Sequence, residues 1–259
     1  MLGLVKLKRS WNWTAWGKHP VAKDYFRVGS QAPILKAFTD WIEKGYHMLS
    51  SKRNHSSNLY SWRFWARGSE KNNIICGVGR DSSDSLGRSY PLLIIGTGPL
   101  QKWEDHWDLL PLACEETWSH IEYLTTKRLL DFKQMENGVR IIKPPYPNWS
   151  EFTNQRGSRF ECSSNNSLFH QYFKGIKESV DSLTKKTEFF VPLDSVSSND
   201  PIALADLWHS FLKSRIREIP NTVFMGGVPD ETYLGVFKRP LVPADFVRLW
   251  SVELIRLSY

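Results

Sequence analysis

Helix-like and strand-like patterns alternate along the whole chain, and this interleaving constrains the fold more than any other feature of the sequence. From Pro33 to Leu49, apolar residues recur at the 3.6-residue spacing of a helix. Three short strand-like segments follow, at residues 59–66, 73–79 and 88–95, and their close spacing predicts an antiparallel meander. We therefore expect a single α/β domain over residues 1–259, built as a three-layer α-β-α sandwich with a mixed, largely antiparallel sheet.

The remaining segments continue this mixture. Apolar residues alternate with others over residues 2–16, which predicts one or two strands. Residues 100–133 predict a helix that is interrupted at Pro111. We expect a short strand over residues 138–143 and a loop over the Pro-, Ser- and Asn-rich residues 144–166. The rest of the chain predicts helices at 167–183, 202–216 and 244–254, and strands at 187–193, 222–226 and 233–238.

The sequence lacks the spacing patterns that mark common enzyme and metal sites. Gly77 and Gly79 follow a predicted strand, but Ser82 stands where the third glycine of a dinucleotide-binding loop belongs. There is no Gly-x-Ser-x-Gly elbow and no Gly-Lys-Ser/Thr phosphate loop, and neither the 7 histidines nor the 3 cysteines show a zinc-ligand spacing. We therefore expect no catalytic residue, no cofactor, no metal and no disulfide framework.

The net charge of +7 is concentrated in the first part of the chain. Residues 1–100 contain 15 Lys and Arg but only 6 Asp and Glu. Such a segment could attract an acidic protein, nucleic acid or a membrane surface. The basic residues are scattered singly, however, and do not form the Lys/Arg blocks of a nucleic-acid-binding arm. We interpret them mainly as a solvated surface and expect no nucleic-acid partner.

Nothing in the sequence predicts export or membrane insertion. Residues 1–9 introduce basic side chains after only a few apolar ones, unlike a signal peptide. No apolar run approaches the roughly 18 residues of a membrane-spanning helix. We expect a soluble, cytoplasmic protein.

Two short motifs remain after this search. The first is Trp16-Gly17-Lys18-His19-Pro20 followed by Asp24-Tyr25, and the second runs from Ser82 to Leu92. Together they resemble the TagF family, also called ImpM, an accessory family of bacterial type VI secretion. The second motif matches every element of the family pattern Ser-x-Asp-x-x-Gly-Arg-x-Tyr/Phe-Pro-Leu. The first differs at Lys23, where the family has glycine, and at Tyr25, where it has Phe.

The resemblance covers the first 100 residues well, and beyond them it rests on the order of elements with weaker echoes at Gly226-Gly227 and Arg239-Pro240-Leu241. It implies a single TagF-like domain without enzymatic activity. Members of the family are understood as post-translational repressors of type VI secretion that bind its forkhead-associated scaffold protein. The residues that define the motifs are therefore candidates for partner binding: Gly17, Lys18, Pro20, Asp24, Tyr25, Asp84, Gly87, Arg88 and Tyr90.

The motifs also have a plausible structural role. Gly17 permits backbone conformations that other residues avoid, and Pro20 fixes the path of the chain. Arg88 precedes a predicted strand, where its guanidinium could fork onto Asp24 or Asp84 and join the two motifs. Such a clamp would hold the fold wherever the partner binds, so a structural role and an interface role both stay open.

Two other classes of function also stay open. An enzyme acting on a phosphorylated or nucleotide substrate could use a pocket lined by Lys18, Asp24, Asp84 and Arg88, and a deep cleft joining these side chains would favour it. A nucleic-acid-binding protein could stack bases on exposed members of the 12 tryptophans, although a bulky aromatic core explains that number as well.

Overall fold

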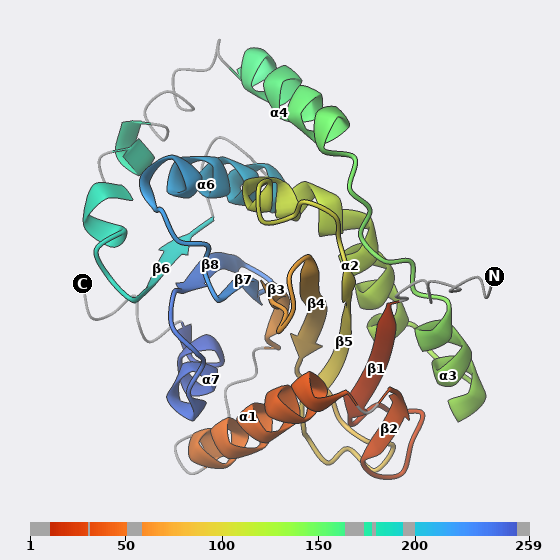
Figure 1. Cartoon of the computed structure of the whole chain (residues 1–259). Coiled ribbons are helices and arrows are strands. Elements are labelled where there is room, and N and C mark those ends of the chain that lie inside the picture. The colour runs from red at the N-terminus through yellow and green to blue at the C-terminus, as the bar shows by residue number, and fades with distance from the viewer. Residues whose placement is uncertain are drawn as a thin grey trace, which may run out of the picture.

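A computed structural model describes residues 11–30, 32–50, 59–163, 174–177, 180–193 and 200–252 of the chain. Eight strands in this part form one sheet in the order β2-β1-β5-β4-β3-β7-β8-β6 (Figure 1). The strands are β1 (Asn12–Gly17), β2 (Phe26–Gly29), β3 (Ser61–Arg67), β4 (Asn73–Arg80), β5 (Leu92–Pro99), β6 (Glu188–Pro192), β7 (Thr222–Val228) and β8 (Glu231–Phe237). The predicted α/β class is confirmed. Every neighbouring pair of these strands is antiparallel, so the sheet is not mixed within the described residues.

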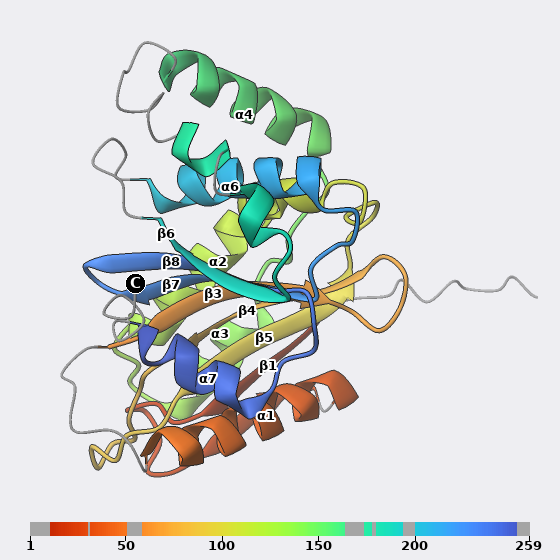
Figure 2. The same cartoon turned by 90° about the vertical axis from the view of Figure 1, so that its left-hand side faces the viewer.

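Helices cover both faces of the sheet, as the predicted three-layer sandwich requires (Figure 2). One face is covered by α1 (Pro33–Ser50) and α7 (Pro243–Leu249), and the other by α2 (Leu110–Thr126), α3 (Phe132–Arg140) and α6 (Pro201–Arg215). A further helix, α4 (Trp149–Ser163), lies outside α6, so that it covers a helix rather than the sheet. No described helix combines the length and apolar character needed to cross a membrane.

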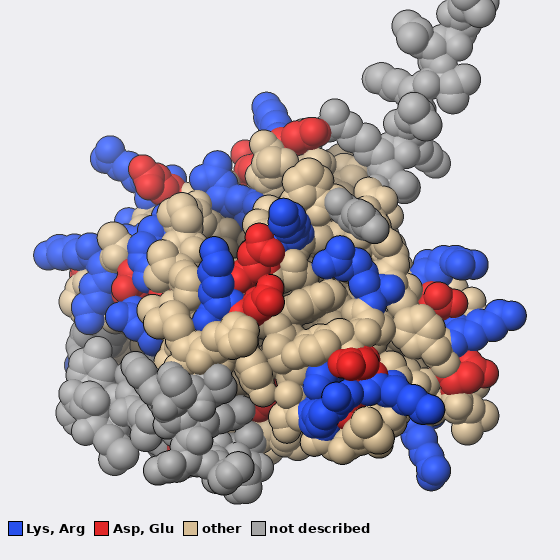
Figure 3. Space-filling view, turned by 90° about the horizontal axis from the view of Figure 1, so that it is seen from below, with Lys and Arg blue, Asp and Glu red and all other residues tan. Residues whose placement is uncertain are grey.

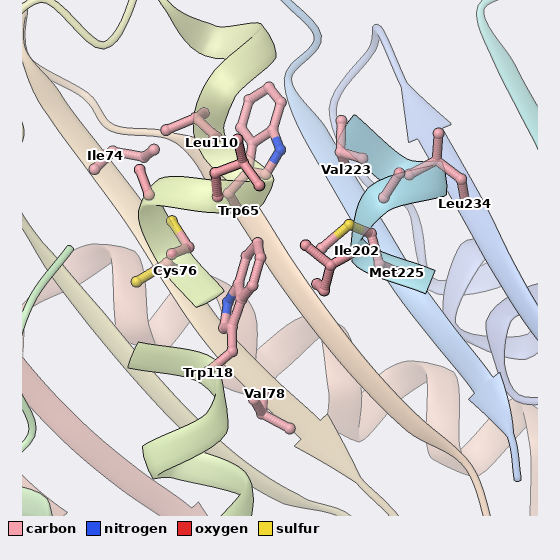
Figure 4. Close-up of a cluster of buried hydrophobic side chains, with 14 of the residues drawn as sticks. Trp65, Ile74, Cys76, Val78, Leu110, Trp118, Ile202, Val223, Met225 and Leu234 are labelled. Carbon is pink, nitrogen blue, oxygen red and sulfur yellow. The ribbon is translucent and has the colours of Figure 1, made fainter. Parts of the chain in front are cut away.

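The central strands are buried on both faces, so successive side chains enter different cores. In β3, Trp62 and Phe64 pack toward α1 and α7, whereas Trp65 packs toward α2 and α6. Trp65 and Trp118 lie among aliphatic side chains and Cys76 in the second of these cores (Figure 4). Ten of the twelve tryptophans are buried and the other two are partly buried, which confirms the aromatic core.

A fully buried histidine joins this core. His209 of α6 accepts a hydrogen bond from Trp65 Nε1 at 3.1 Å through Nε2, and its Nδ1 lies 2.6 Å from the backbone oxygen of Ala205. This pairing places the single ring proton on Nδ1. Because burial penalises the charged ring, the pKa of His209 falls to about 4, and the side chain is neutral near pH 7.

Two predictions for the middle of the chain are wrong. Residues 138–143 do not form a strand, because α3 continues to Arg140 and residues 141–143 are irregular. The backbone N–H of Gln134 donates a 2.9 Å hydrogen bond to Asp131, which caps this helix. Residues 144–166 contain α4 rather than only a loop, although Trp149 and Phe152 pack inward as expected.

Other predictions need smaller corrections. Pro111 does not interrupt a helix; it lies in the first turn of α2, where a missing N–H is tolerated. The strand predicted from residue 88 begins only at Leu92, because residues 88–91 belong to the loop before it. The helix predicted over residues 100–133 is shorter, since α2 spans only Leu110–Thr126, and the helix predicted at 244–254 ends at Leu249. The remaining predicted helices and strands are found within a few residues of their expected bounds. Residues 174–177 and 180–183 of the helix predicted at 167–183 are helical, whereas residues 2–10 and 253–254 lie outside the described residues.

Networks of arginine and carboxylate groups attach two of the outer helices. Arg156 of α4 donates to both carboxylate oxygens of Asp206, at 2.6 and 2.8 Å, and to Asp108 Oδ2 at 2.6 Å. Arg239 similarly donates to both oxygens of Asp245 at the start of α7, at 2.7 and 2.8 Å. Bidentate pairs of this kind fix orientation as well as distance.

Candidate partner-binding site

The two motifs meet because β1 lies beside β5 in the sheet. The end of β1 pairs with the start of β5 and of β2, with Gly17 opposite both Leu92 and Phe26. The loop after β1 (residues 18–25) and the loop before β5 (residues 81–91) therefore emerge at the same end of the sheet. The backbone N–H of Ser85 donates a 2.9 Å hydrogen bond to the oxygen of Ala22, which ties the two loops together.

Gly17 begins this arrangement in a conformation that suits glycine. Its φ of +124° is rarely adopted by residues with a side chain. A Cβ atom at this position would lie 2.1 Å from the backbone oxygen of Pro91, which belongs to the second motif. The glycine therefore allows the two motif backbones to approach each other closely.

Asp84 is the centre of the contact between the motifs, and only 2% of it is exposed. Its Oδ2 lies 3.0 Å from Lys18 Nζ and accepts a 2.7 Å hydrogen bond from Arg88 Nε. Its Oδ1 accepts hydrogen bonds from the backbone N–H groups of Leu86 and Arg88, at 3.0 and 2.9 Å. We call Lys18, Asp84 and Arg88 the clamp.

Arg88 extends the clamp to the end of the first motif. Its Nη2 donates a 2.7 Å hydrogen bond to the backbone oxygen of Lys23 and lies 3.4 Å from Asp24 Oδ2. Arg88 thus contacts both carboxylates that the sequence offered as partners. The contact between Lys18 and Asp84 was not predicted, because nothing in the sequence shows that a lysine at the end of one strand reaches a carboxylate 66 residues later.

The environment of Asp84 keeps its carboxylate ionised and supplies both of its oxygens with hydrogen-bond donors. Burial alone would raise the pKa of its carboxyl group, but hydrogen bonds from Arg88, Lys18 and Leu86 outweigh burial and hold that pKa well below its ordinary value. Four donors share its two oxygens, so this carboxylate has little capacity left to accept another proton or ligand. The arrangement therefore suits a structural role, in which Asp84 holds the two loops in fixed positions.

Aromatic side chains pack beside the clamp. Lys18 Nζ lies 4.8 Å from the centre of the Tyr25 ring, and this ring meets Tyr90 edge-on at 4.6 Å. Tyr90 is buried, whereas 53% of Tyr25 is exposed. Tyr25 thus connects the buried clamp with the surface.

The loops present a small exposed tip, which we define as Leu86, Tyr25 and the outer part of Arg88. Leu86 is 68% exposed and half of the Arg88 side chain is exposed. Gly87, with a φ of +77°, completes the turn between them. Tyr and Arg side chains are enriched in protein-binding surfaces, and Leu86 adds exposed apolar area to the same pair of loops.

The structure brings the predicted site residues into one region but gives them different environments. Lys18, Asp84 and Tyr90 are buried, Gly17 is buried between strands, and Pro20, Asp24, Tyr25, Gly87 and Arg88 are exposed. The sequence reasoning missed Leu86, which the motif pattern leaves unspecified. A lone leucine between Ser85 and Gly87 in a polar turn was the available signal.

The surface charge does not concentrate at this end of the molecule. Figure 3 views the face that carries α1, and its Lys and Arg side chains intermix with Asp and Glu around a largely uncharged centre. The expected excess of basic residues is therefore distributed on this face rather than gathered into one patch.

A substrate pocket of the kind considered for an enzyme would need the clamp charges to face a shared cleft. The neighbouring groove is lined by Tyr25 and Tyr90 but not by Lys18, Asp24, Asp84 or Arg88. Instead these four charges are directed at one another. Among the described residues, no group of three or more His, Cys, Asp or Glu side chains is arranged to hold a metal ion.

Comparison with known families identifies the segment that contains both motifs. Residues 14–141 match the TagF N-terminal domain, which is described as type VI secretion system-associated. This part of the chain belongs to the TagF family. The match includes both TagF motifs, the clamp and the tip, and it ends after α3.

Other comparisons add little to the TagF assignment. Among solved structures, the chain is similar to the crystal structure of PA0076 from Pseudomonas aeruginosa PAO1, with 15% sequence identity over 93% of each chain and a TM-score of 0.49. A similarity of this size does not by itself establish shared function. A search of curated proteins finds no match.

Proposed function

We propose that this protein is a non-enzymatic, cytoplasmic accessory protein of type VI secretion that represses the machine after translation by binding its forkhead-associated scaffold subunit. The observation that carries the proposal is the membership of residues 14–141 in the TagF family. Two parts of this proposal, repression and the identity of the partner, are carried over to this chain from what the family resemblance implies.

The geometry of the motifs supports different roles for their buried and their exposed residues within this function. The buried members of the clamp hold the loops, while the tip is available for a partner. Tyr and Arg side chains often dominate the affinity of an interface, and the neighbouring side chains that a partner covers exclude water around them. We therefore assign partner contact to Leu86 and Tyr25 and loop positioning to Lys18 and Asp84.

The first test is the affinity of the purified protein for the forkhead-associated scaffold subunit of the same secretion system, measured by isothermal titration calorimetry. The variant is Leu86→Asp, which places a charge at the tip without touching the clamp. Leu130→Asp is the matched control, because Leu130 is 84% exposed and lies between α2 and α3, outside both motifs and the tip. We expect Leu86→Asp to weaken binding by at least about tenfold, and Leu130→Asp to leave it unchanged.

Each outcome is informative once circular dichroism shows that both variants fold. No binding by the unmodified protein would refute the proposed partner. Equal binding by both variants would keep the partner but remove the tip from the interface. In cells, loss of repression with Leu86→Asp at an unchanged protein level would connect the tip to secretion.

A further inference from the structure

The sheet has two edge strands, β2 and β6, and β2 lies directly after the tip residue Tyr25 (Figure 1). β2 pairs with β1 on its inner side. The backbone N–H of Ser30 donates a 3.2 Å hydrogen bond to the oxygen of Trp13, which continues the register of these two strands by one residue. Hydrogen-bonded and non-hydrogen-bonded pairs alternate along antiparallel strands. The backbone N–H and C=O groups of Arg27 and Gly29 therefore face away from β1.

We call these outward backbone groups of Arg27 and Gly29 the free edge. Both residues are exposed, and within the described residues neither makes a backbone hydrogen bond on the outward side. An N–H and a C=O that point the same way at every second residue match the groups of another extended backbone, as when a peptide adds a strand to a sheet. The free edge therefore suits an extended segment better than a helix.

The other edge strand is less suited to pairing. The backbone N–H of Leu193 donates a 2.7 Å hydrogen bond to the oxygen of Thr232, one residue beyond the pair of Pro192 with Tyr233. By the same alternation, Pro192 of β6 faces outward. Proline has no N–H to donate, and natural sheets use it to protect their edges. An added strand can therefore pair more completely with β2 than with β6.

Arg27 gives the free edge a preference for one sign of charge. In the part of the chain that the structure describes, its guanidinium makes no hydrogen bond, ion pair or ring contact. Opposite charges that face each other directly on neighbouring strands stabilise the pairing, and like charges destabilise it. The groove beside Arg27 contains both signs, so we assign the preference to Arg27 alone. Its charged and titratable lining residues are Arg27, Lys36, Asp40, Glu43 and His47.

The same charge argues against a second copy of this chain as the occupant. Two β2 strands side by side would bring two Arg27 side chains to one short edge, where like charges repel. An arginine on an edge also discourages pairing with strands in general, and a strand with a carboxylate opposite it overcomes this barrier. The free edge therefore favours an acidic segment.

We propose that the free edge of β2 binds an extended, acidic segment of the protein partner, which adds a strand to the sheet and places an Asp or Glu opposite Arg27. This inference rests on the proposed function, since it names the part of the partner that lies next to the tip. Leu86 and Tyr25 contact the partner through their side chains, whereas β2 contacts it mainly through the backbone.

A direct test does not require the partner. The probe is the peptide acetyl-Thr-Val-Glu-Val-Thr-amide. One control peptide has Lys in place of Glu, and the other has N-methyl-Glu, which lacks the N–H that would donate to the oxygen of Arg27. Nuclear magnetic resonance of the full chain follows the titrations. We expect the amides of Arg27 and Gly29 to shift and to exchange more slowly with solvent. The Glu peptide should bind at least about threefold more tightly than either control.

Two variants of Arg27 separate the side chain from the backbone. Arg27→Ala removes the charge and keeps the N–H, so it should abolish the preference for Glu over Lys. Arg27→Pro also removes the N–H, which β1 does not use, so the fold should tolerate it while binding weakens at least about threefold further. Lys71→Ala is the charge control, because Lys71 is exposed between β3 and β4, and β1 and β5 separate these strands from β2.

Several outcomes would overturn the proposal once circular dichroism shows that the variants fold. These are equal binding of the three peptides, shifts confined to other surfaces, and an unchanged preference for Glu in Arg27→Ala. A dimer of the free protein that Arg27→Pro dissociates in analytical ultracentrifugation would also overturn it, because a second copy would then occupy the free edge.

Scaffold binding by the same variants separates this proposal from the proposed function. If Leu86→Asp weakens scaffold binding but Arg27→Pro does not, and the peptides show no preference, the function stands and the assignment of the free edge fails. If the scaffold subunit does not bind at all while the Glu peptide binds as expected, the assignment of the free edge stands and the partner is wrong.

Discussion

At the scale of single residues, the contacts of Asp84 divide the motif residues into two groups. Lys18 and Asp84 are buried and satisfy each other, so a change in either disturbs the folding of the loops. Tyr25 and Leu86 are exposed and have room to change without disturbing that pair. Variants intended to probe binding therefore belong to the second group.

Gly17 and Gly87 form a matched pair of glycines with positive φ. We expect Gly87→Ala to lower the free energy of unfolding by about 1–2 kcal/mol, because its backbone conformation disfavours a Cβ while no atom lies within 4 Å of the added methyl group. Gly17→Ala should be more destabilising, because its methyl group also meets the oxygen of Pro91. Urea unfolding of both variants measures the difference, and equal losses would contradict the close approach of the motif backbones.

His209 predicts a specific dependence of stability on pH. Its pKa is about 4 in the folded protein and near 6.5 when unfolded, so the unfolded chain binds the proton first as pH falls. This contribution to stability is fully present above pH 6.5 and decreases toward pH 4. It should lower the free energy of unfolding by about 2 kcal/mol between pH 7.5 and pH 5.

Urea unfolding at several pH values measures this slope. In His209→Gln the part of the slope that belongs to this residue should disappear, whatever the absolute stability of the variant. A slope that is unchanged in the variant would mean that other groups cause the loss.

The sequence was sufficient to propose that Arg88 joins Asp24 and Asp84, because charge type and position suggested it. It was not sufficient to distinguish buried from exposed motif residues. Charged side chains are mostly exposed, yet Lys18 is buried because Asp84 offers it a partner in the fold. That distinction depends on the pairing of β1 with β5, which is a long-range contact.

At the scale of elements, α4 is attached mainly through a few specific contacts. It lies outside α6, and the side chains it buries within the described part are Trp149 and Phe152. The Nε1 of Trp149 donates a 2.9 Å hydrogen bond to the oxygen of Gln101, and Arg156 bridges Asp108 and Asp206. The position of α4 therefore depends strongly on a single arginine.

We expect Arg156→Met to loosen α4, because it leaves the buried Asp206 without its bidentate partner. Removing one member of a buried pair is destabilising by about 3 kcal/mol. Hydrogen exchange should become faster in α4 and at the start of α6, while the amides of β3 to β5 remain protected.

Lys143→Met serves as the control for that experiment. It removes an exposed pair with Glu116 at 3.5 Å, which contributes less than about 1 kcal/mol. Unchanged protection of α4 in the Arg156 variant would show that apolar packing alone holds the helix.

The misassignment of α4 has a physical explanation. Prolines at 144, 145 and 147 and the polar residues that follow indicate a loop. Among the α4 side chains that the structure describes, Trp149 and Phe152 are the buried apolar ones, so the periodic pattern of a helix is weak. By contrast, α1 buries a full stripe, including Leu35, Phe38 and Ile42, and its position was predicted closely. Helices held by ion pairs rather than apolar stripes escape prediction from sequence.

At the scale of the whole molecule, the sheet crosses the boundary of the family match. β3 pairs with β4 on one side and, on the other, with β7, which comes from residues 222–228. Both cores also combine side chains from before and after residue 141. This continuity agrees with the hypothesis of one domain over residues 1–259, although the family match itself covers only residues 14–141.

We expect residues 1–141, produced alone, to aggregate or to lack cooperative unfolding. The fragment would expose the edge of β3 together with Trp65 and Phe64, which α6, β7 and α7 help to cover in the full chain. Size-exclusion chromatography and thermal unfolding monitored by circular dichroism test this. A monomeric fragment with a cooperative transition would instead show that the chain contains two independent folding units.

The pairing of β1 with β5, which brings the clamp residues together, also limits how relatives can vary in length. Lys18 and Asp84 meet through the register of β1 against β5, not through the chain that separates them. The number of residues within each motif therefore cannot change, whereas insertions and deletions between the motifs leave the contact intact. Distant members of the family should be recognised by two sequence motifs of fixed length that are separated by a segment of variable length.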